Sequence, residues 1–174
     1  MSKTAVNSVT NANVYLNGTN TLGRAEEVKL PSVKNKTSDH KALGMFSEIK
    51  LPTGGLEPME CEYNWVSVYP EISREISDPR RSVTMQVRAT IEAYTSSGFS
   101  AEMPLVATLS GPFTESGLGG FKQHEAVKTT SKQSVWYYKL EIDGETVYEI
   151  DVFANIRKVA GEDVLARFRR ILGA

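Results

Sequence analysis

The residues of this 174-residue chain that could support nucleophilic or metal chemistry are two histidines and one cysteine. A hydrolytic triad needs a histidine held by a carboxylate beside a nucleophile. His40 and His124 lie in polar, irregular stretches without such neighbours, so we expect both to be solvated. Cys61 alternates with large apolar residues, which is typical of a buried, protonated and unreactive thiol. A single cysteine also excludes an intrachain disulfide and a zinc site of several cysteines.

A glycine-rich stretch, Gly117-Leu118-Gly119-Gly120, is similar in composition to a phosphate-binding loop. A phosphate loop, however, opens a helix and carries Lys-Ser or Lys-Thr at a fixed spacing. Here the glycines stand between two segments that read as strands, and a flexible surface loop is predicted. We therefore predict no catalytic residue, no cofactor and no metal site, and expect a protein that is not an enzyme.

Carboxylates form the last candidate set. They occupy polar positions in segments that alternate between polar and apolar residues: Glu57, Glu60, Glu62, Glu141, Glu149 and Asp151. Paired carboxylates can hydrolyse glycosides or bind metal ions. Regular alternation with apolar residues is instead typical of the solvated face of a strand, so acidic sheet faces are predicted.

Alternation with a period of two dominates the chain and predicts a mainly β fold with antiparallel sheets. The clearest strands are expected at residues 59–65, 83–93, 103–109, 136–142 and 148–152. Asn17-Gly18 and Asp143-Gly144 each predict a two-residue hairpin turn of type I′. Residues 28–30 are expected to continue the sheet that residues 14–16 begin.

Helices are predicted at two places. A short central helix is expected at residues 70–77, with Pro70 in its first turn and Pro79 after its end. A C-terminal helix is expected over about residues 162–172, with Gly161 near its start and Gly173 at its end. One face of that helix is apolar, formed by Val164, Leu165, Phe168, Ile171 and Leu172.

The polar segment at residues 31–52 is too long for an ordinary loop, and we interpret it as an extended hairpin arm. Such an arm has no core of its own and needs a partner surface. The formal net charge is −1, from 20 basic and 21 acidic residues, which argues against a basic nucleic-acid-binding face and leaves little repulsion between copies. No apolar run reaches the roughly 18 residues of a membrane helix. A single self-assembling domain over residues 1–174 is predicted.

The last forty residues are similar to the C-terminal segment of the major tail tube proteins of contractile-tailed phages and of R-type pyocin tubes. The similarity lies in residues 137–144, 147–151, 159–165 and 169–173, and in the N-terminal half in residues 13–18, 28–31 and 55–60. It covers nearly the whole chain in order but is weak at residues 66–130. Ala160 stands where the family usually has Asn, and Glu162 where an apolar residue is common, so the start of the C-terminal helix departs from the pattern.

The resemblance implies an antiparallel β-sandwich or barrel-like tail tube fold and a structural role. Hexameric rings would stack into a hollow tube inside a contractile sheath, and contraction would drive the tube through the target envelope so that DNA passes along its lumen. Implied partners are other copies, the sheath protein, baseplate or tube-initiating proteins, the tail terminator, the tape measure protein and transiting DNA. Sequence-specific nucleic-acid binding and membrane insertion of the monomer are not expected. The implied location is the virion tail, assembled in the host cytoplasm.

Two sets of residues would serve this role. The arm would bury Leu43, Met45, Phe46 and Ile49 against a neighbouring subunit. Lumen-facing acids, which repel phosphates and keep DNA from sticking, would be drawn from Glu60, Glu62, Glu141, Glu149 and Asp151. Alternation does not tell which sheet faces the lumen.

Alternatives within this class are the tube of a headless pyocin-like particle, a tube-related baseplate or terminator protein, and a secretion tube protein. A more distant alternative is a β-sandwich module that binds carbohydrate. That module would expose aromatic residues on a sheet face, whereas most aromatic residues here alternate in step with aliphatic ones, which favours a core.

Overall fold

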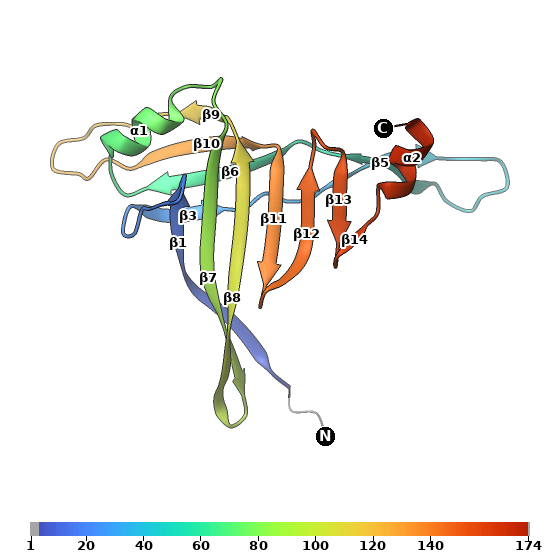
Figure 1. Cartoon of the computed structure of the whole chain (residues 1–174), viewed down its shortest axis with the longest axis horizontal. Coiled ribbons are helices and arrows are strands. Elements are labelled where there is room, and N and C mark those ends of the chain that lie inside the picture. The colour runs from blue at the N-terminus through green and yellow to red at the C-terminus, as the bar shows by residue number, and fades with distance from the viewer. Residues whose placement is uncertain (1–3, 174) are drawn as a thin grey trace.

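A computed structural model describes residues 4–173, so residues 1–3 and 174 of the expected domain lie outside the described residues. Two sheets face each other across one hydrophobic core, and the strands of the rear sheet run across those of the front sheet (Figure 1). Every strand pair among the described residues is antiparallel. The expected mainly β, antiparallel fold is confirmed.

The front sheet has eight strands in the order β14-β13-β12-β11-β8-β7-β1-β2. Its longest strands, β7 and β8, form a hairpin that projects with the start of β1 beyond the rear sheet (Figure 1). The strands are β1 (Val6–Leu16), β2 (Thr19–Asn20), β7 (Val83–Thr95), β8 (Gly98–Gly111), β11 (Tyr137–Ile142), β12 (Glu145–Asp151), β13 (Ile156–Val159) and β14 (Glu162–Asp163).

The rear sheet has four strands in the order β3-β6-β10-β9. They are β3 (Ala25–Lys29), β6 (Met59–Trp65), β10 (Thr129–Val135) and β9 (Phe113–Ser116). The prediction that residues 28–30 continue the sheet of residues 14–16 was wrong, because β3 pairs with β6. The reason is the turn before it: Thr21 binds back to the carbonyl of Val14, and Gly23 at φ 75° helps to redirect the chain into the other layer.

The core forms where the apolar positions of both sheets meet. Met59, Cys61, Tyr63 and Trp65 of β6 are buried, and the alternate residues of that strand point away from the core. The buried positions of the front sheet include Val83, Met85, Val87, Ala107, Leu109, Tyr138 and Ile150. Burying one such large side chain contributes about 1.5–3 kcal/mol. The alternation read from the sequence therefore corresponds to inward and outward faces of two packed sheets.

Both predicted type I′ turns are present. Asn17 and Gly18 have φ of 46° and 81°, and Asp143 and Gly144 have φ of 51° and 77°. Positive φ at both central residues is what this turn requires, and it joins β1 to β2 and β11 to β12. The central helix is also confirmed as α1 (Pro70–Ile76), which is anchored through its buried isoleucines.

The C-terminal helix α2 (Ala166–Leu172) is shorter than predicted, and its expected start near residue 162 was wrong. Ala160 and Gly161, with φ of 49° and 84°, form a tight turn that brings β14 back onto β13. The Asp163 carboxylate accepts a hydrogen bond from the Leu165 N–H at 3.1 Å just before the helix begins. Gly173 ends α2 in the left-handed conformation, as predicted.

The arm is a separate two-stranded sheet of β4 (Asn35–His40) and β5 (Ile49–Leu56). Its pairing runs from His40 opposite Ile49 to Asn35 opposite Leu56, so the hairpin continues past residue 52, where we expected it to end. Every residue of β4 is exposed. The arm extends sideways past α2 and away from the sandwich (Figure 1).

Candidate functional site

The tip of the arm carries large apolar side chains that the chain itself leaves uncovered. Leu43 and Phe46 are 105% and 106% exposed relative to an extended reference, and Met45 and Ile49 are also exposed. The tip turns through Gly44 at φ 84°, and the Met45 N–H donates to the Ala42 carbonyl. These four residues are the ones that the sequence assigned to an inter-subunit contact.

The base of the arm is held in place by hydrogen bonds. The Arg157 guanidinium donates to Asn35 Oδ1 at 2.8 Å, which ties β4 to the front sheet. The Glu57 N–H donates to the Lys34 carbonyl at 2.9 Å. The base therefore sets the direction in which the apolar tip is presented.

The five candidate lumen acids divide into two sets on opposite surfaces. Glu60 and Glu62 lie on β6 and point outward from the rear sheet. Glu141, Glu149 and Asp151 lie on β11 and β12, in the front sheet, on positions that alternate with core residues. Because the core separates the two sheets, the two sets face away from each other, and one lumen surface cannot contain all five.

The outward positions of β6 and β10 are all polar: Glu60, Glu62, Asn64, Thr130, Lys132 and Ser134. The Lys29 ammonium donates to Glu62 Oε1 at 2.6 Å, which lowers the pKa of that carboxyl. Lys132 lies 3.0 Å from a Glu115 oxygen and 4.0 Å from a Glu60 oxygen. Lys29 pairs with Glu27 and Glu62, and Lys132 with Glu60 and Glu115. With four carboxylates for two ammonium groups, the rear face is net acidic although its acids form ion pairs.

On the front face each of the three acids has a local partner. Lys139 lies 2.8 Å from Glu141, and Lys158 lies 2.8 Å from Glu149. The Tyr137 hydroxyl also donates to Glu149 at 3.1 Å, and partial burial together with that carboxylate raises the tyrosine pKa to about 12. Asp151 accepts the Ala154 N–H at 2.9 Å and so shapes the turn after β12.

The apolar face of α2 is a second uncovered surface. Val164, Phe168, Ile171 and Leu172 are exposed, and no residue of the helix is buried. The helix is attached by its polar side, where the Arg169 guanidinium meets the Asp163 carboxylate at 2.6 Å and donates to the Asn155 carbonyl. Its orientation is therefore fixed while its apolar face stays free for a partner.

Sequence reasoning missed two exposed aromatic pairs at opposite ends of the front sheet. The rings of Trp136 and Phe153 meet edge to face at 5.1 Å, and those of Tyr94 and Phe99 at 5.9 Å. Trp136 was expected to share the inward face of its strand, but it precedes β11 at the border of the sandwich and is exposed. The signal in the sequence was the place of Trp136 at the very start of its predicted strand. At a strand end that the second sheet does not cover, alternation no longer predicts burial.

The residues considered for chemistry are not brought together. His40 and His124 are both exposed, and within residues 4–173 the imidazole of neither takes part in a hydrogen bond or an ion pair. Cys61 is fully buried, and burial raises the pKa of its thiol to about 12. Within the same residues no three potential metal ligands cluster, and neither helix is long and apolar enough to cross a bilayer. The glycine loop 117–120 joins β9 to β10 and opens no helix.

Comparison with known proteins finds a family model that matches nearly the whole chain. The family model of the phage tail tube protein FII matches residues 6–173, including the middle of the chain where the motif similarity was weak. The tail tube protein of Escherichia phage P2 is 26% identical over 163 residues, which cover 92% of this chain and 94% of that protein. The major tail tube protein of Serratia phage KSP20 is 29% identical over 153 residues, covering 87% and 86%.

Proposed function

Since the chain belongs to the family of phage tail tube proteins FII, we propose that its copies form hexameric rings that stack into a hollow tube. It is a structural component of a phage tail. A contact between unlike surfaces of successive copies gives a ring where its rotation closes and a helical filament where it does not, so stacked rings need one contact of each kind. The role we propose is mechanical, with no catalysed reaction: the tube is driven through the target envelope and conducts DNA.

The observation that carries this proposal is the arm. A hairpin with an exposed apolar tip and a hydrogen-bonded base is suited to reach a second copy and bury Leu43 and Phe46 there. Each of these side chains, once covered, contributes about 1.5–3 kcal/mol to the contact. Repeated at every subunit, such a contribution favours assembly over free subunits.

The double variant Leu43→Ser/Phe46→Ser tests the arm. Both side chains are fully exposed in the single chain, so the variant should fold like the wild type by circular dichroism. Electron microscopy and sedimentation should show tubes for the wild type and none for the variant. The matched control Lys41→Ser/Ser47→Ala changes the same turn without removing apolar surface and should still form tubes. Tubes of the Leu43/Phe46 variant at the wild-type concentration would exclude the arm as an assembly element.

We propose that the outward face of the rear sheet lines the lumen, with Glu60 and Glu62 among its acids. One feature supports this choice over the front face. The outward positions of β6 and β10 carry no apolar side chain, whereas those of the front sheet include Val106, which pairs with Glu141. The carboxylates of the rear face also outnumber the ammonium groups beside them. A polar, net acidic wall repels phosphates and offers DNA no apolar contact. Glu141, Glu149 and Asp151 would then face outward from the tube.

Neutralising the proposed lumen acids distinguishes which of the two faces lines the lumen. Phage carrying Glu60→Gln/Glu62→Gln should build tails of normal length and eject DNA more slowly. Glu141→Gln, a single neutralisation on the opposite face, should leave the rate of ejection unchanged. Normal ejection from the double variant would remove these acids from the lumen, and slow ejection from the Glu141 variant alone would assign the lumen to the front sheet.

The remaining partners follow from a tube of this kind. We propose that a sheath protein surrounds its outer face, that a baseplate initiator and a tail terminator bind its ends, and that a tape measure protein occupies the lumen before DNA does. No sequence-specific contact with DNA is proposed, because an acidic wall repels the backbone on which such binding depends. Co-purification of the sheath protein with tubes, but not with the Leu43→Ser/Phe46→Ser subunits, is the expected result.

A further inference from the structure

We propose that copies of this chain join head to tail through two surfaces of the front sheet, an inference that rests on the proposed self-assembly. The first surface is the outer end of the β7–β8 hairpin, formed by Glu92, Tyr94, Phe99 and Glu102, and is called the hairpin end. The second is the opposite border of the same sheet, formed by Arg80, Trp136 and Phe153, and is called the rim. The hairpin end of one copy would bind the rim of the next.

The hairpin end contains two facing carboxylates that have no cationic partner within residues 4–173. Glu92 and Glu102 lie directly opposite each other on paired strands. Like charges in that position destabilise a strand pair, and within residues 4–173 neither carboxylate forms an ion pair. The Tyr94 hydroxyl donates to Glu92 at 2.6 Å, so the aromatic residue and the acids form one connected surface.

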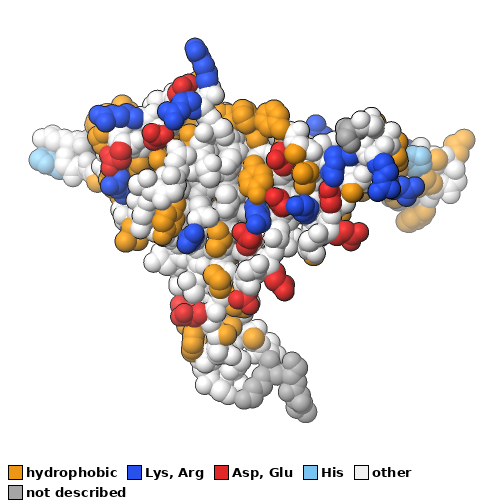
Figure 2. All heavy atoms as spheres, viewed as in Figure 1, with side chains coloured by type: hydrophobic (Ala, Val, Ile, Leu, Met, Phe, Trp, Pro, Cys, Tyr) orange, Lys and Arg blue, Asp and Glu red, His pale blue; other side chains and the backbone are white. Residues whose placement is uncertain are grey.

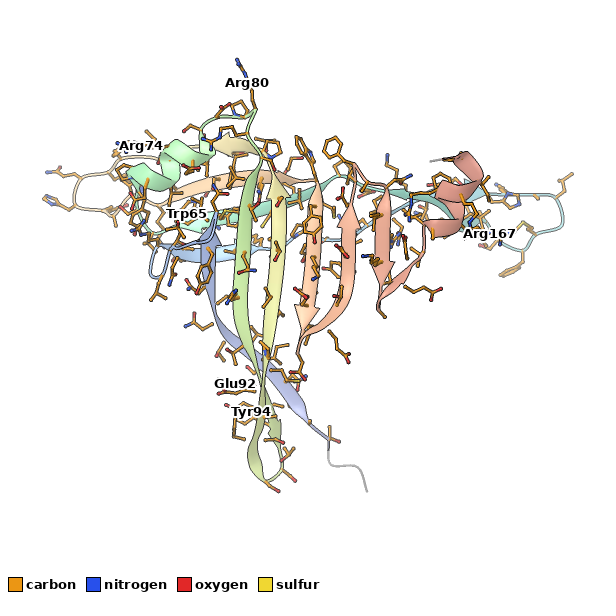
Figure 3. All side chains as sticks on the ribbon, in the orientation of Figure 1. Trp65, Arg74, Arg80, Glu92, Tyr94 and Arg167 are labelled. Carbon is orange, nitrogen blue, oxygen red and sulfur yellow. The ribbon has the colours of Figure 1, made fainter. Side chains whose placement is uncertain are left out.

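The hairpin end also exposes two large aromatic side chains. Phe99 is 58% exposed and packs edge to face on Tyr94, which is exposed too. No rear strand backs this part of the front sheet, as Figure 1 shows. Figure 3 places Glu92 and Tyr94 on the projecting end of the hairpin, far from the sandwich core.

The rim offers the complementary groups. The Arg80 side chain points away from the molecule (Figure 3), and within residues 4–173 it makes no ion pair. Phe153 is 78% exposed and packs on Trp136. Trp136 also borders a cavity of about 390 Å³ that is lined in part by Met59 and Val135, so an aromatic ring has room beside it. The Trp136 N–H donates to the Ser110 carbonyl and Val83 pairs with Gly111, so Arg80 and the aromatic pair lie at the same end of the front-sheet strands. A cation and exposed rings at this end complement the acids and exposed rings of the hairpin end.

The two surfaces of one copy cannot meet each other. Strand β7 begins at Val83 beside the rim and ends at Thr95, and 13 residues at about 3.3 Å each span roughly 40 Å. Figure 2 shows acidic side chains along the border on the hairpin side, and Figure 3 shows Arg80 projecting from the opposite border. The exposed turns add Asp143, Glu145 and Glu162 to the acidic border. The acids of the hairpin end repel those of a second hairpin end and attract Arg80 of the rim, which favours head-to-tail contacts over contacts between two hairpin ends.

A charge exchange tests the contact. Arg80→Glu and Glu102→Arg should each raise the protein concentration needed for assembly about tenfold, because each places like charges in the contact. The double variant Arg80→Glu/Glu102→Arg should recover most of the wild-type behaviour. Lys122→Glu, the same change of charge on the exposed loop between β9 and β10, serves as the control and should assemble normally. The particle left by the single variants, ring or free subunit, identifies the step that the contact serves.

Disulfide trapping gives an independent readout. Because Cys61 is buried, cysteines introduced by Ser100→Cys at the hairpin end and Ala154→Cys at the rim are the reactive ones. The double variant should form a ladder of covalent oligomers on mild oxidation, whereas either single variant should not.

The outcomes separate the two proposals. If wild-type protein forms no assembly under any condition, both fail. If it assembles while the single charge variants assemble equally well and the cysteine pair gives no ladder, self-assembly stands and the head-to-tail contact is overturned.

Discussion

Replacing Tyr63 by Phe tests how the two sheets are held together. Gln133 of β10 is completely buried, and its amide donates to the carbonyls of Val83 at 2.7 Å and Gly111 at 3.0 Å in the front sheet. Its Oε1 accepts the Tyr63 hydroxyl of β6 at 2.9 Å. One glutamine side chain thus bridges both layers with all its polar atoms paired. Tyr63→Phe removes one hydroxyl and leaves the ring in place.

The expected cost follows from the acceptor that is left behind. Gln133 Oε1 loses its donor at a position with no exposed surface, and a buried unpaired polar atom costs about 1–3 kcal/mol. For a chain of this size each kcal/mol lowers Tm by roughly 2–4 °C, so a decrease of about 2–12 °C is expected. Tyr15→Phe is the matched control, since the Tyr15 hydroxyl binds no residue in the range 4–173 and the ring stays beneath Arg88. Its effect should stay within about 0.5 kcal/mol.

Urea unfolding, followed by the fluorescence of the buried Trp65, measures both variants. The experiment is run at a protein concentration where sedimentation shows only free subunits, so that assembly does not add to the measured stability. The slope of the free energy against urea should be unchanged, because the native fold is the same. If Tyr63→Phe unfolds at the same midpoint as Tyr15→Phe, the bridge through Gln133 does not stabilise the sandwich.

Two further predictions concern the joints of the fold. Gly111→Ala should destabilise the chain by about 1–3 kcal/mol, because a Cβ there would lie 1.9 Å from the Ser134 carbonyl oxygen, whereas Gly120→Ala, which meets no atom within 4 Å, should be nearly neutral in urea unfolding. The hydrogen bond from Arg169 lowers the pKa of Asp163, so this pair stabilises the fold above the ordinary carboxyl pKa near 4 and the contribution disappears as pH falls through the lowered value. Asp163→Asn should therefore lose less stability than the wild type between pH 5 and about 2, and equal losses in the two proteins would contradict this.

Local patterns in the sequence predicted the strands and turns well because they depend on neighbouring residues. Alternation at residues 59–65 and 83–93 follows from one face packing on the core, and Asp143-Gly144 forms its turn because both residues adopt positive φ. Strand partners are a different matter. Nothing local in residues 28–30 says that β3 joins β6, since that choice is made by the turn at residues 21–24.

The candidate acids show the same limit at the level of the site. Glu60 and Glu141 occupy equivalent positions in their local patterns, each alternating with core residues. Alternation shows that both side chains point away from the core. Whether they point outward from the front sheet or from the rear sheet depends on which sheet the strand joins, and the local pattern does not contain that information. The sequence could therefore name the acidic faces without separating the two surfaces that carry them.

The apolar residues that stay exposed carry the most information about function. Phe168 and Ile171 follow a helical period as regular as that of a buried helix, yet no residue of α2 is buried within the chain. A regular apolar period predicts that this face is buried when the protein functions. It does not predict whether the same chain or another molecule covers it. In a subunit that functions only when assembled, part of the hydrophobic pattern belongs to contacts between copies. The places where a regular apolar pattern meets solvent, at α2 and at the arm tip with Phe46, are therefore where other molecules of the tail should be sought.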